Sequence, residues 1–110
     1  AHITGGGLIE NIPRILPDIY KAKIFKDRWR IPSIFQLIQE AGRIEETEMF
    51  RTFNCGIGMV IIVSGKDADN AIKRLKALKE TPFLIGNIEK RTPKHVPACI
   101  KQGEDSVVII

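Results

Sequence analysis

Three consecutive glycines, Gly5 to Gly7, stand near the start of the chain in the stretch "HITGGGL". Glycine loses more backbone entropy on folding than any other residue, so such a run is expected where the backbone passes close to another group or adopts a positive φ. The residues that follow, "LIENIPRIL", place apolar side chains at helical spacing until Pro13 and Pro17 limit or kink the helix. The sequence therefore predicts a glycine loop that leads into a helix.

A glycine loop of this kind has two interpretations. Its N–H groups and the helix dipole would favour an anion such as phosphate by about 0.3 to 1 kcal/mol. The run lacks both the G-x-G-x-x-G spacing of a dinucleotide fold and the Lys-Ser/Thr of a P-loop. A tight turn where a strand and a helix pack closely explains the glycines equally well. The residue types alone leave both interpretations open.

Helical and strand-like patterns alternate along the rest of the chain. Helices are expected from Pro32 to a cap at Gly42, within 43–54, and after a Ser64–Asp67 capping box as far as residue 78. Strands are expected at 21–27, 58–64, 83–91 and 106–110. The unbroken apolar run "GMVIIVS" at 58–64 predicts a central strand covered on both faces. Together these patterns indicate an α/β or α+β fold, a mixed sheet with packed helices.

Composition narrows the class of protein. The chain has 110 residues, of which 44% are hydrophobic, and no apolar run approaches the ~20 residues of a membrane span. Its two cysteines, Cys55 and Cys99, suit reduced, partly buried thiols better than a disulfide framework or a zinc cluster, which favours the cytoplasm. We expect a soluble globular protein, and the opening Ala1-His2 without an initiator Met looks like part of a longer one.

Basic residues concentrate in the second half of the chain. Residues 66–101 hold nine Lys or Arg and four Asp or Glu, within a net charge of +4. A basic nucleic-acid-binding module is therefore an alternative function. Against it, Phe83 is the only aromatic residue in this region, and a solvated helix face explains the lysines. A regulatory or subunit-contact role would leave the glycine run unexplained.

Three longer motifs carry a resemblance to a known family. The stretches "AHITGGGLIENIPRILP", "RIPSIFQLIQEAG" and "EMFRTFNCGIGMVIIV" closely resemble the aminoimidazole ribonucleotide synthetases, the phosphoribosylformylglycinamidine cyclo-ligases of purine biosynthesis. The resemblance runs from residue 1 to about residue 88 and resumes in the last strand. It departs at 90–105, "KRTPKHVPACIKQGED", which looks longer and more basic than the usual connection.

The resemblance implies an ATP-dependent ligase. Such an enzyme activates the formyl amide oxygen of formylglycinamidine ribonucleotide, and an internal amine then closes the imidazole ring to give aminoimidazole ribonucleotide, ADP and phosphate. An N-terminal domain, which lies outside residues 1–110, would mainly bind ATP and Mg²⁺ and form the homodimer contact. By the resemblance, 1–110 is a single partial C-terminal domain, inactive alone, with no membrane or nucleic-acid partner.

The resemblance also implies site residues. Thr4, Gly5, Gly6 and Gly7 match the family loop and are expected to contact a phosphate or the reacting amidine region. His2 is expected to hydrogen-bond substrate or transfer a proton, although a structural hydrogen bond would also explain it.

Other candidate residues keep two interpretations each. Arg51 would hold a phosphate or pair with Glu48, and Asn54 would orient substrate or cap the preceding helix.

Cys55 lacks the His and Asp partners of a nucleophile, so a buried thiol is favoured. No metal site is expected, because the acidic residues lack a metal-ligand pattern. The acidic residues considered are Asp18, Asp27, Glu45, Glu46 and Glu48.

Overall fold

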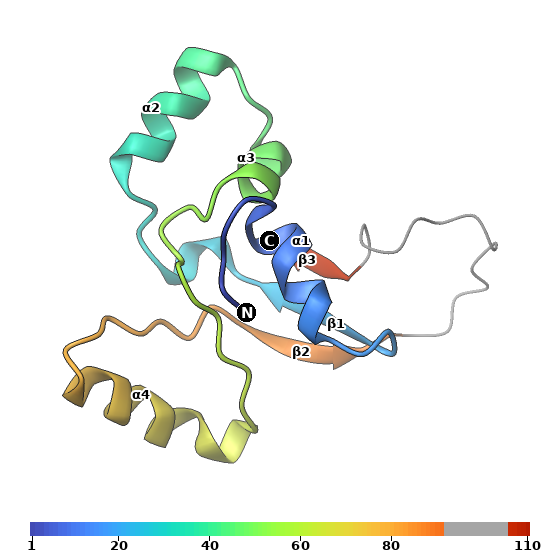
Figure 1. The fold of residues 1–110 in the computed structure, drawn as a ribbon, viewed down its shortest axis with the longest axis vertical. Coiled ribbons are helices and arrows are strands. Elements are labelled where there is room, and N and C mark those ends of the chain that lie inside the picture. The colour runs from blue at the N-terminus through green and yellow to red at the C-terminus, as the bar shows by residue number, and fades with distance from the viewer. Residues whose placement is uncertain (92–105) are drawn as a thin grey trace.

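The computed structural model describes residues 1–91 and 106–110 (Figure 1). The helices are α1 (Gly7–Asn11), α2 (Ser33–Gly42), α3 (Glu46–Thr52) and α4 (Ala68–Ala77), and the strands are β1 (Tyr20–Ile24), β2 (Gly86–Lys90) and β3 (Val107–Ile109). Short 3-10 turns lie at Ile12–Ile15, Lys26–Arg28 and Gly65–Asp67. The first of these continues α1 through Pro13, as the proline pattern predicted.

The three strands form one mixed sheet in the order β2-β1-β3. Strand β1 pairs antiparallel with β2 and parallel with β3, so that Ala22 lies opposite both Ile88 and Val107. On the same antiparallel pair, the Nζ atoms of Lys21 and Lys23 lie 3.7 and 3.9 Å from carboxylate oxygens of Glu89. The expected mixed sheet with packed helices is therefore confirmed, as an α+β arrangement.

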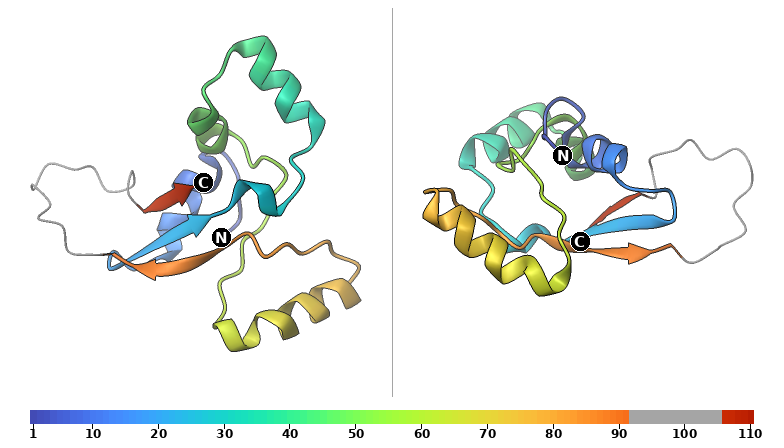
Figure 2. Two further views of the ribbon diagram at one scale, coloured as in Figure 1. Left: turned by 180° about the vertical axis from the view of Figure 1, so that it is seen from behind. Right: turned by 60° about the horizontal axis from the view of Figure 1, so that its bottom comes forward.

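The core lies between the sheet, α1 and α3. Helix α1 lies over one face of the sheet, and α3 packs beside α1 (Figures 1 and 2). Leu8 and Ile12 of this helical stretch are completely buried, which fits the apolar spacing read from the sequence. The buried core is made of Ile3, Leu8, Ile9, Ile12, Ala22, Ile24, Trp29, Met49, Phe50, Cys55, Ile57 and Val107.

Helix α2 confirms the predicted helix and corrects both of its ends. It begins at Ser33, one residue after Pro32, and Gly42 is its last helical residue. The left-handed cap is Arg43, at φ 50°, and not the expected Gly42. Ile44 explains the small residue at 42, because a Cβ there would lie 2.9 Å from its side chain.

The predicted central strand at 58–64 is wrong. Only a single bridge forms there, between Met59 and His2, and the backbone continues to residue 64 without a strand. Ile61, Ile62 and Val63 are exposed, at 57%, 40% and 44%. A buried strand needs hydrogen-bonded neighbours and covered faces, and among residues 1–91 and 106–110 this segment finds neither beyond the bridge.

Helix α4 was predicted, and its start differs in detail. Ser64 hydrogen-bonds the Asp67 carboxylate, while the Asp67 N–H donates to the Ser64 carbonyl, so a 3-10 turn precedes the helix in place of a full capping box. Figure 1 shows α4 apart from α1 and α3, and Lys73, Arg74 and Lys76 are exposed. In the part of the chain that the structure describes, no helix has the length and apolar character needed to cross a bilayer.

Candidate functional site

The three glycines of the loop meet different surroundings. A Cβ on Gly7 would lie 2.1 Å from the Phe50 carbonyl oxygen, so this position is fixed by the close approach of α1 to α3. Gly6 precedes α1 at φ 98°, a conformation that side chains disfavour. Gly5 faces open space, with nothing within 4 Å of a Cβ built there. The tight-packing interpretation therefore holds for Gly7, and Gly5 remains free for contact with a ligand.

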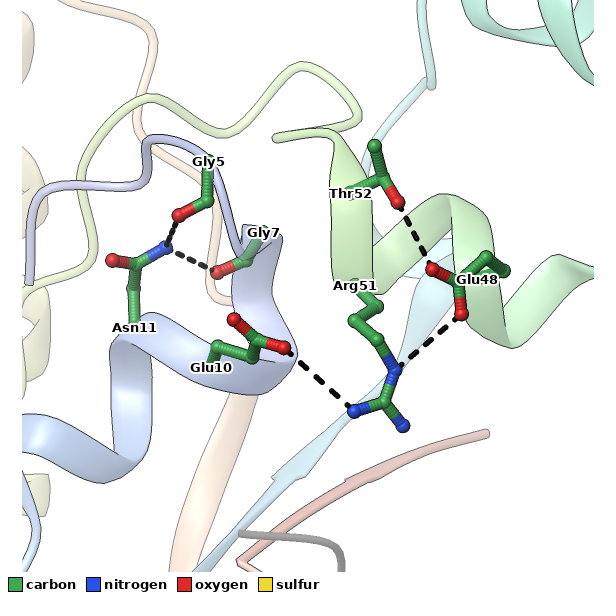
Figure 3. A network of polar contacts seen from close by, with 7 residues as sticks. All are labelled: Gly5, Gly7, Glu10, Asn11, Glu48, Arg51 and Thr52. Atoms are coloured by element: carbon green, nitrogen blue, oxygen red, sulfur yellow. Dashed lines mark hydrogen bonds and ion pairs between the residues drawn. The ribbon is translucent and has the colours of Figure 1, made fainter.

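Asn11 holds this loop from inside the protein. Its side-chain nitrogen Nδ2 donates to the carbonyl oxygens of Gly7 at 2.8 Å and Gly5 at 3.2 Å (Figure 3). It also donates to the Thr4 carbonyl oxygen at 3.4 Å. The residue is only 4% exposed. Sequence reasoning missed it, although an Asn inside an apolar helical stripe, four residues after Gly7, is a usable signal of a buried polar contact.

His2 and Thr4 lie on the outward side of the first extended segment. Ile3 between them is 3% exposed, whereas both neighbours are exposed, as expected for an extended backbone with alternating side chains. The segment is fixed by the bond from the Ile3 N–H to the Gly58 carbonyl at 2.9 Å. His2 and Thr4 are thus accessible on the segment that enters the glycine loop.

Arg51 reaches from α3 toward Glu10 of α1. Its guanidinium lies 3.8 Å from Glu10 Oε1 on α1 and 3.5 Å from Glu48 Oε2 on its own helix (Figure 3). Thr52 Oγ1 hydrogen-bonds Glu48 at 3.2 Å. Of the two interpretations of Arg51, the structure shows the pairing with Glu48, and the phosphate contact stays a prediction. Arg51 is one-third exposed, so it keeps access to solvent beside the loop.

Asn54 forms a turn and does not cap the preceding helix. Its Oδ1 accepts the Gly56 N–H at 2.9 Å, and its carbonyl accepts the Ile57 N–H at 2.9 Å. The next residue, Cys55, has φ 50° and its carbonyl accepts the Trp29 indole N–H at 3.0 Å. Trp29 therefore fixes the segment before Pro32.

Cys55 is a buried thiol, as expected. Its Sγ lies 3.6 Å from the Met49 carbonyl oxygen, and the residue is 1% exposed. Burial raises the pKa of the thiol to about 11, so it is protonated at neutral pH. A protonated, enclosed sulfur is a poor nucleophile, and the site chemistry does not rest on it.

Metal-ligating side chains do not gather in the described part of the chain. Residues 1–91 and 106–110 contain no group of three or more His, Cys, Asp or Glu able to hold a metal ion. The expectations for Cys99 and for most of the basic segment 90–105 concern residues outside the described ranges.

Comparison with known proteins places the chain in a family. The model of the AIR synthase related protein, C-terminal domain, matches residues 1–96. The phosphoribosylformylglycinamidine cyclo-ligase of Geotalea daltonii is 62% identical over 90 residues, 82% of this chain and 26% of that protein. The cyclo-ligase of Citrifermentans bemidjiense is 60% identical over 90 residues, again 82% of this chain and 26% of that protein.

A third relative extends the match to the whole chain. The cyclo-ligase of Syntrophotalea carbinolica is 48% identical over 110 residues, which is 100% of this chain and 29% of that protein. The chain thus spans between a quarter and a third of the length of these curated relatives. None of these matches supports the nucleic-acid-binding alternative. On the match over residues 1–96, the chain belongs to the family of AIR synthase related C-terminal domains.

Proposed function

We propose that this chain is the C-terminal part of a phosphoribosylformylglycinamidine cyclo-ligase. The observation that carries the proposal is the 62% identity to a relative of that name, beside a family match over residues 1–96 that includes the glycine loop. The product would be aminoimidazole ribonucleotide, made in the cytoplasm during purine biosynthesis.

The reaction is a phosphoryl-activated ring closure. The formyl amide oxygen of formylglycinamidine ribonucleotide attacks the γ-phosphorus of ATP, which forms an O–P bond and releases ADP. An internal amine nitrogen then attacks the activated carbon, and a C–N bond forms. The C–O bond breaks, phosphate leaves with that oxygen, and the nitrogen loses its proton. The protein's contribution would be to orient the amine and stabilise the leaving phosphate.

The first extended segment and its loop would supply the substrate contacts of this chain. Thr4 and Gly5 are exposed and adjacent, and nothing fills the space at Gly5. His2 lies on the same outward side as Thr4, where it would hydrogen-bond substrate or accept the proton of the ring nitrogen. Arg51 would exchange its 3.5 and 3.8 Å carboxylate contacts for a phosphate oxygen. Asn54 already uses its Oδ1 in a turn, which leaves its NH₂ group for substrate.

ATP, Mg²⁺ and the dimer contact would belong to the rest of the enzyme. In the described ranges, no cluster of acidic or imidazole side chains fits a divalent cation, so no step of this proposal passes through a metal held here. The relatives are three to four times as long as the matched stretch, which leaves ample chain for those roles. We propose a homodimer formed by that other part.

A growth experiment tests the proposal. A hybrid enzyme is built in which this chain replaces the matching stretch of the Geotalea daltonii cyclo-ligase. It is expressed in a bacterium that lacks its own cyclo-ligase and therefore requires purines. The hybrid enzyme is expected to restore growth without purines, whereas the truncated relative without the matching stretch is not. Failure of a soluble, folded hybrid enzyme to restore growth would contradict the proposal.

A further inference from the structure

Asn11 offers one side-chain amide to three carbonyl oxygens of the same loop. Its Nδ2 lies 2.8 Å from Gly7 O, 3.2 Å from Gly5 O and 3.4 Å from Thr4 O. It is one of two buried polar residues among those described, and none of the buried side-chain nitrogen or oxygen atoms there lacks a partner. A buried amide that serves a single loop fixes the conformation of that loop.

These bonds, together with the turn bond from the Gly7 N–H to the Thr4 carbonyl at 3.0 Å, fix where the other N–H groups of the loop point. In a trans peptide the C=O and the following N–H lie in the same plane and point in opposite directions. The carbonyls of Thr4 and Gly5 point toward Asn11, so the N–H groups of Gly5 and Gly6 point away from it. Neither of these two N–H groups has a hydrogen-bond acceptor within residues 1–91 and 106–110.

We propose that Asn11 is a positioning residue for the substrate loop. It turns the two outward N–H groups of Gly5 and Gly6 toward the substrate without touching the substrate itself. The inference rests on the proposed function, which assigns substrate contact to this loop. It adds a requirement for a hydrogen-bond donor at residue 11, because only a donor can hold carbonyl oxygens inward.

Asn11→Asp in the hybrid enzyme tests that requirement. The side chain keeps its shape but loses both donor hydrogens, and a carboxylate repels the carbonyl oxygens. The matched control is Asn70→Asp on α4, an exposed position that gains the same charge away from the loop. We measure kcat/KM for formylglycinamidine ribonucleotide at saturating ATP, KM for ATP, and the melting temperature.

Asn11→Asp is expected to lower kcat/KM for the ribonucleotide by at least tenfold and to change KM for ATP by less than about twofold, because ATP would bind elsewhere. Asn70→Asp is expected to change neither quantity. If Asn11 had a purely structural role, Asn11→Asp would lower the melting temperature and would affect the kinetic constants for both substrates alike. Two results for a folded Asn11→Asp enzyme would contradict the positioning role. One is an unchanged kcat/KM for the ribonucleotide, and the other is a KM for ATP that worsens as much as kcat/KM for the ribonucleotide falls.

Amide exchange covers the case in which Asn11→Asp fails to fold. In the unsubstituted hybrid enzyme labelled with ¹⁵N-glycine, the Gly5 and Gly6 amides are expected to exchange rapidly with solvent. Aminoimidazole ribonucleotide together with ADP should slow both of them. Protection of these amides in the unliganded enzyme would overturn the inference, because it would show that they point inward.

The two proposals fail in different ways. A folded hybrid enzyme that closes no ring contradicts the proposed function, and exchange at Gly5 and Gly6 still reports the loop orientation. An active hybrid enzyme that tolerates Asn11→Asp contradicts only the role of Asn11.

Discussion

Gly7 lies directly against the backbone of Phe50, so closely that a Cβ at residue 7 would be 2.1 Å from the Phe50 carbonyl oxygen. The first turn of α1 and the end of α3 therefore share a contact that admits no side chain. This contact places the glycine loop beside Arg51, the residue that follows Phe50, and joins the two sides of the candidate site.

Substitution of Gly7 tests this contact. Gly7→Ala must shift backbone and adopt a positive φ of 55°, so it is expected to destabilise the domain by roughly 3 kcal/mol or more. Gly5→Ala meets open space and should change stability by less than about 1 kcal/mol. Urea unfolding of the hybrid enzyme measures both values. Equal stability of the two variants would show that α1 and α3 are not in this contact.

Gly5→Val tests ligand contact at the loop. The branched side chain would occupy the space that the proposal gives to substrate, so kcat/KM should fall about 100-fold, equivalent to roughly 2.7 kcal/mol. The melting temperature should stay nearly unchanged, because the residue buries nothing. Gly65→Val is the matched control, with equally open space before α4. Normal catalysis by Gly5→Val would exclude substrate from this side of the loop.

Local sequence signals predicted the elements whose apolar pattern is regular and bounded by turn or cap residues. Helix α2 follows Pro32 and ends at Gly42, and a strand forms within the expected stretch 21–27, with Ala22 and Ile24 buried. The apolar run at 58–64 was misassigned because hydrophobicity predicts burial, whereas strand formation depends on a neighbour that sequence patterns do not supply.

The sequence selected the residues of the candidate site, and it did not indicate the contacts among them. The motif drew attention to the glycines, but only the fold separates Gly7, which packs on Phe50, from Gly5, which is open. The role of Asn11 was not predicted because it depends on hydrogen bonds to three carbonyl groups of the folded loop. A sequence pattern does not show which backbone groups a side chain will reach.

The Cys55 thiol predicts a pH dependence of stability. Its pKa is about 11 in the folded chain and 9.0 without burial, so above pH 9 the unfolded chain releases a proton that the folded chain retains. The free energy of unfolding should therefore fall between pH 9 and 11 by up to about 1.4 kcal/mol per pH unit from this group. Cys55→Ala should remove that part of the slope. Urea unfolding of the hybrid enzyme between pH 9 and 11 measures this slope with and without the substitution. If Cys55→Ala leaves the pH slope of the unfolding free energy unchanged, the burial of the thiol is contradicted.

The exposed segment 59–63 predicts self-association of the isolated chain. Met59 and Ile61 are 60% and 57% exposed, and the segment has strand partners only at the bridge to His2 within the described residues. Ile61→Lys should weaken association. Ile34→Lys, on the exposed face of α2, serves as the control for a different apolar position. Light scattering that finds only monomer of the unsubstituted chain at high micromolar concentration would contradict this prediction.

Ring closure measured with purified protein tests the central claim most directly. ADP and aminoimidazole ribonucleotide are quantified after ATP and formylglycinamidine ribonucleotide are mixed with the hybrid enzyme or with the isolated chain. The hybrid enzyme is expected to form one aminoimidazole ribonucleotide for each ADP, and the isolated chain to form neither. A folded hybrid enzyme without product, or ring closure by the isolated chain, would contradict the assignment of this chain as the C-terminal part of the ligase.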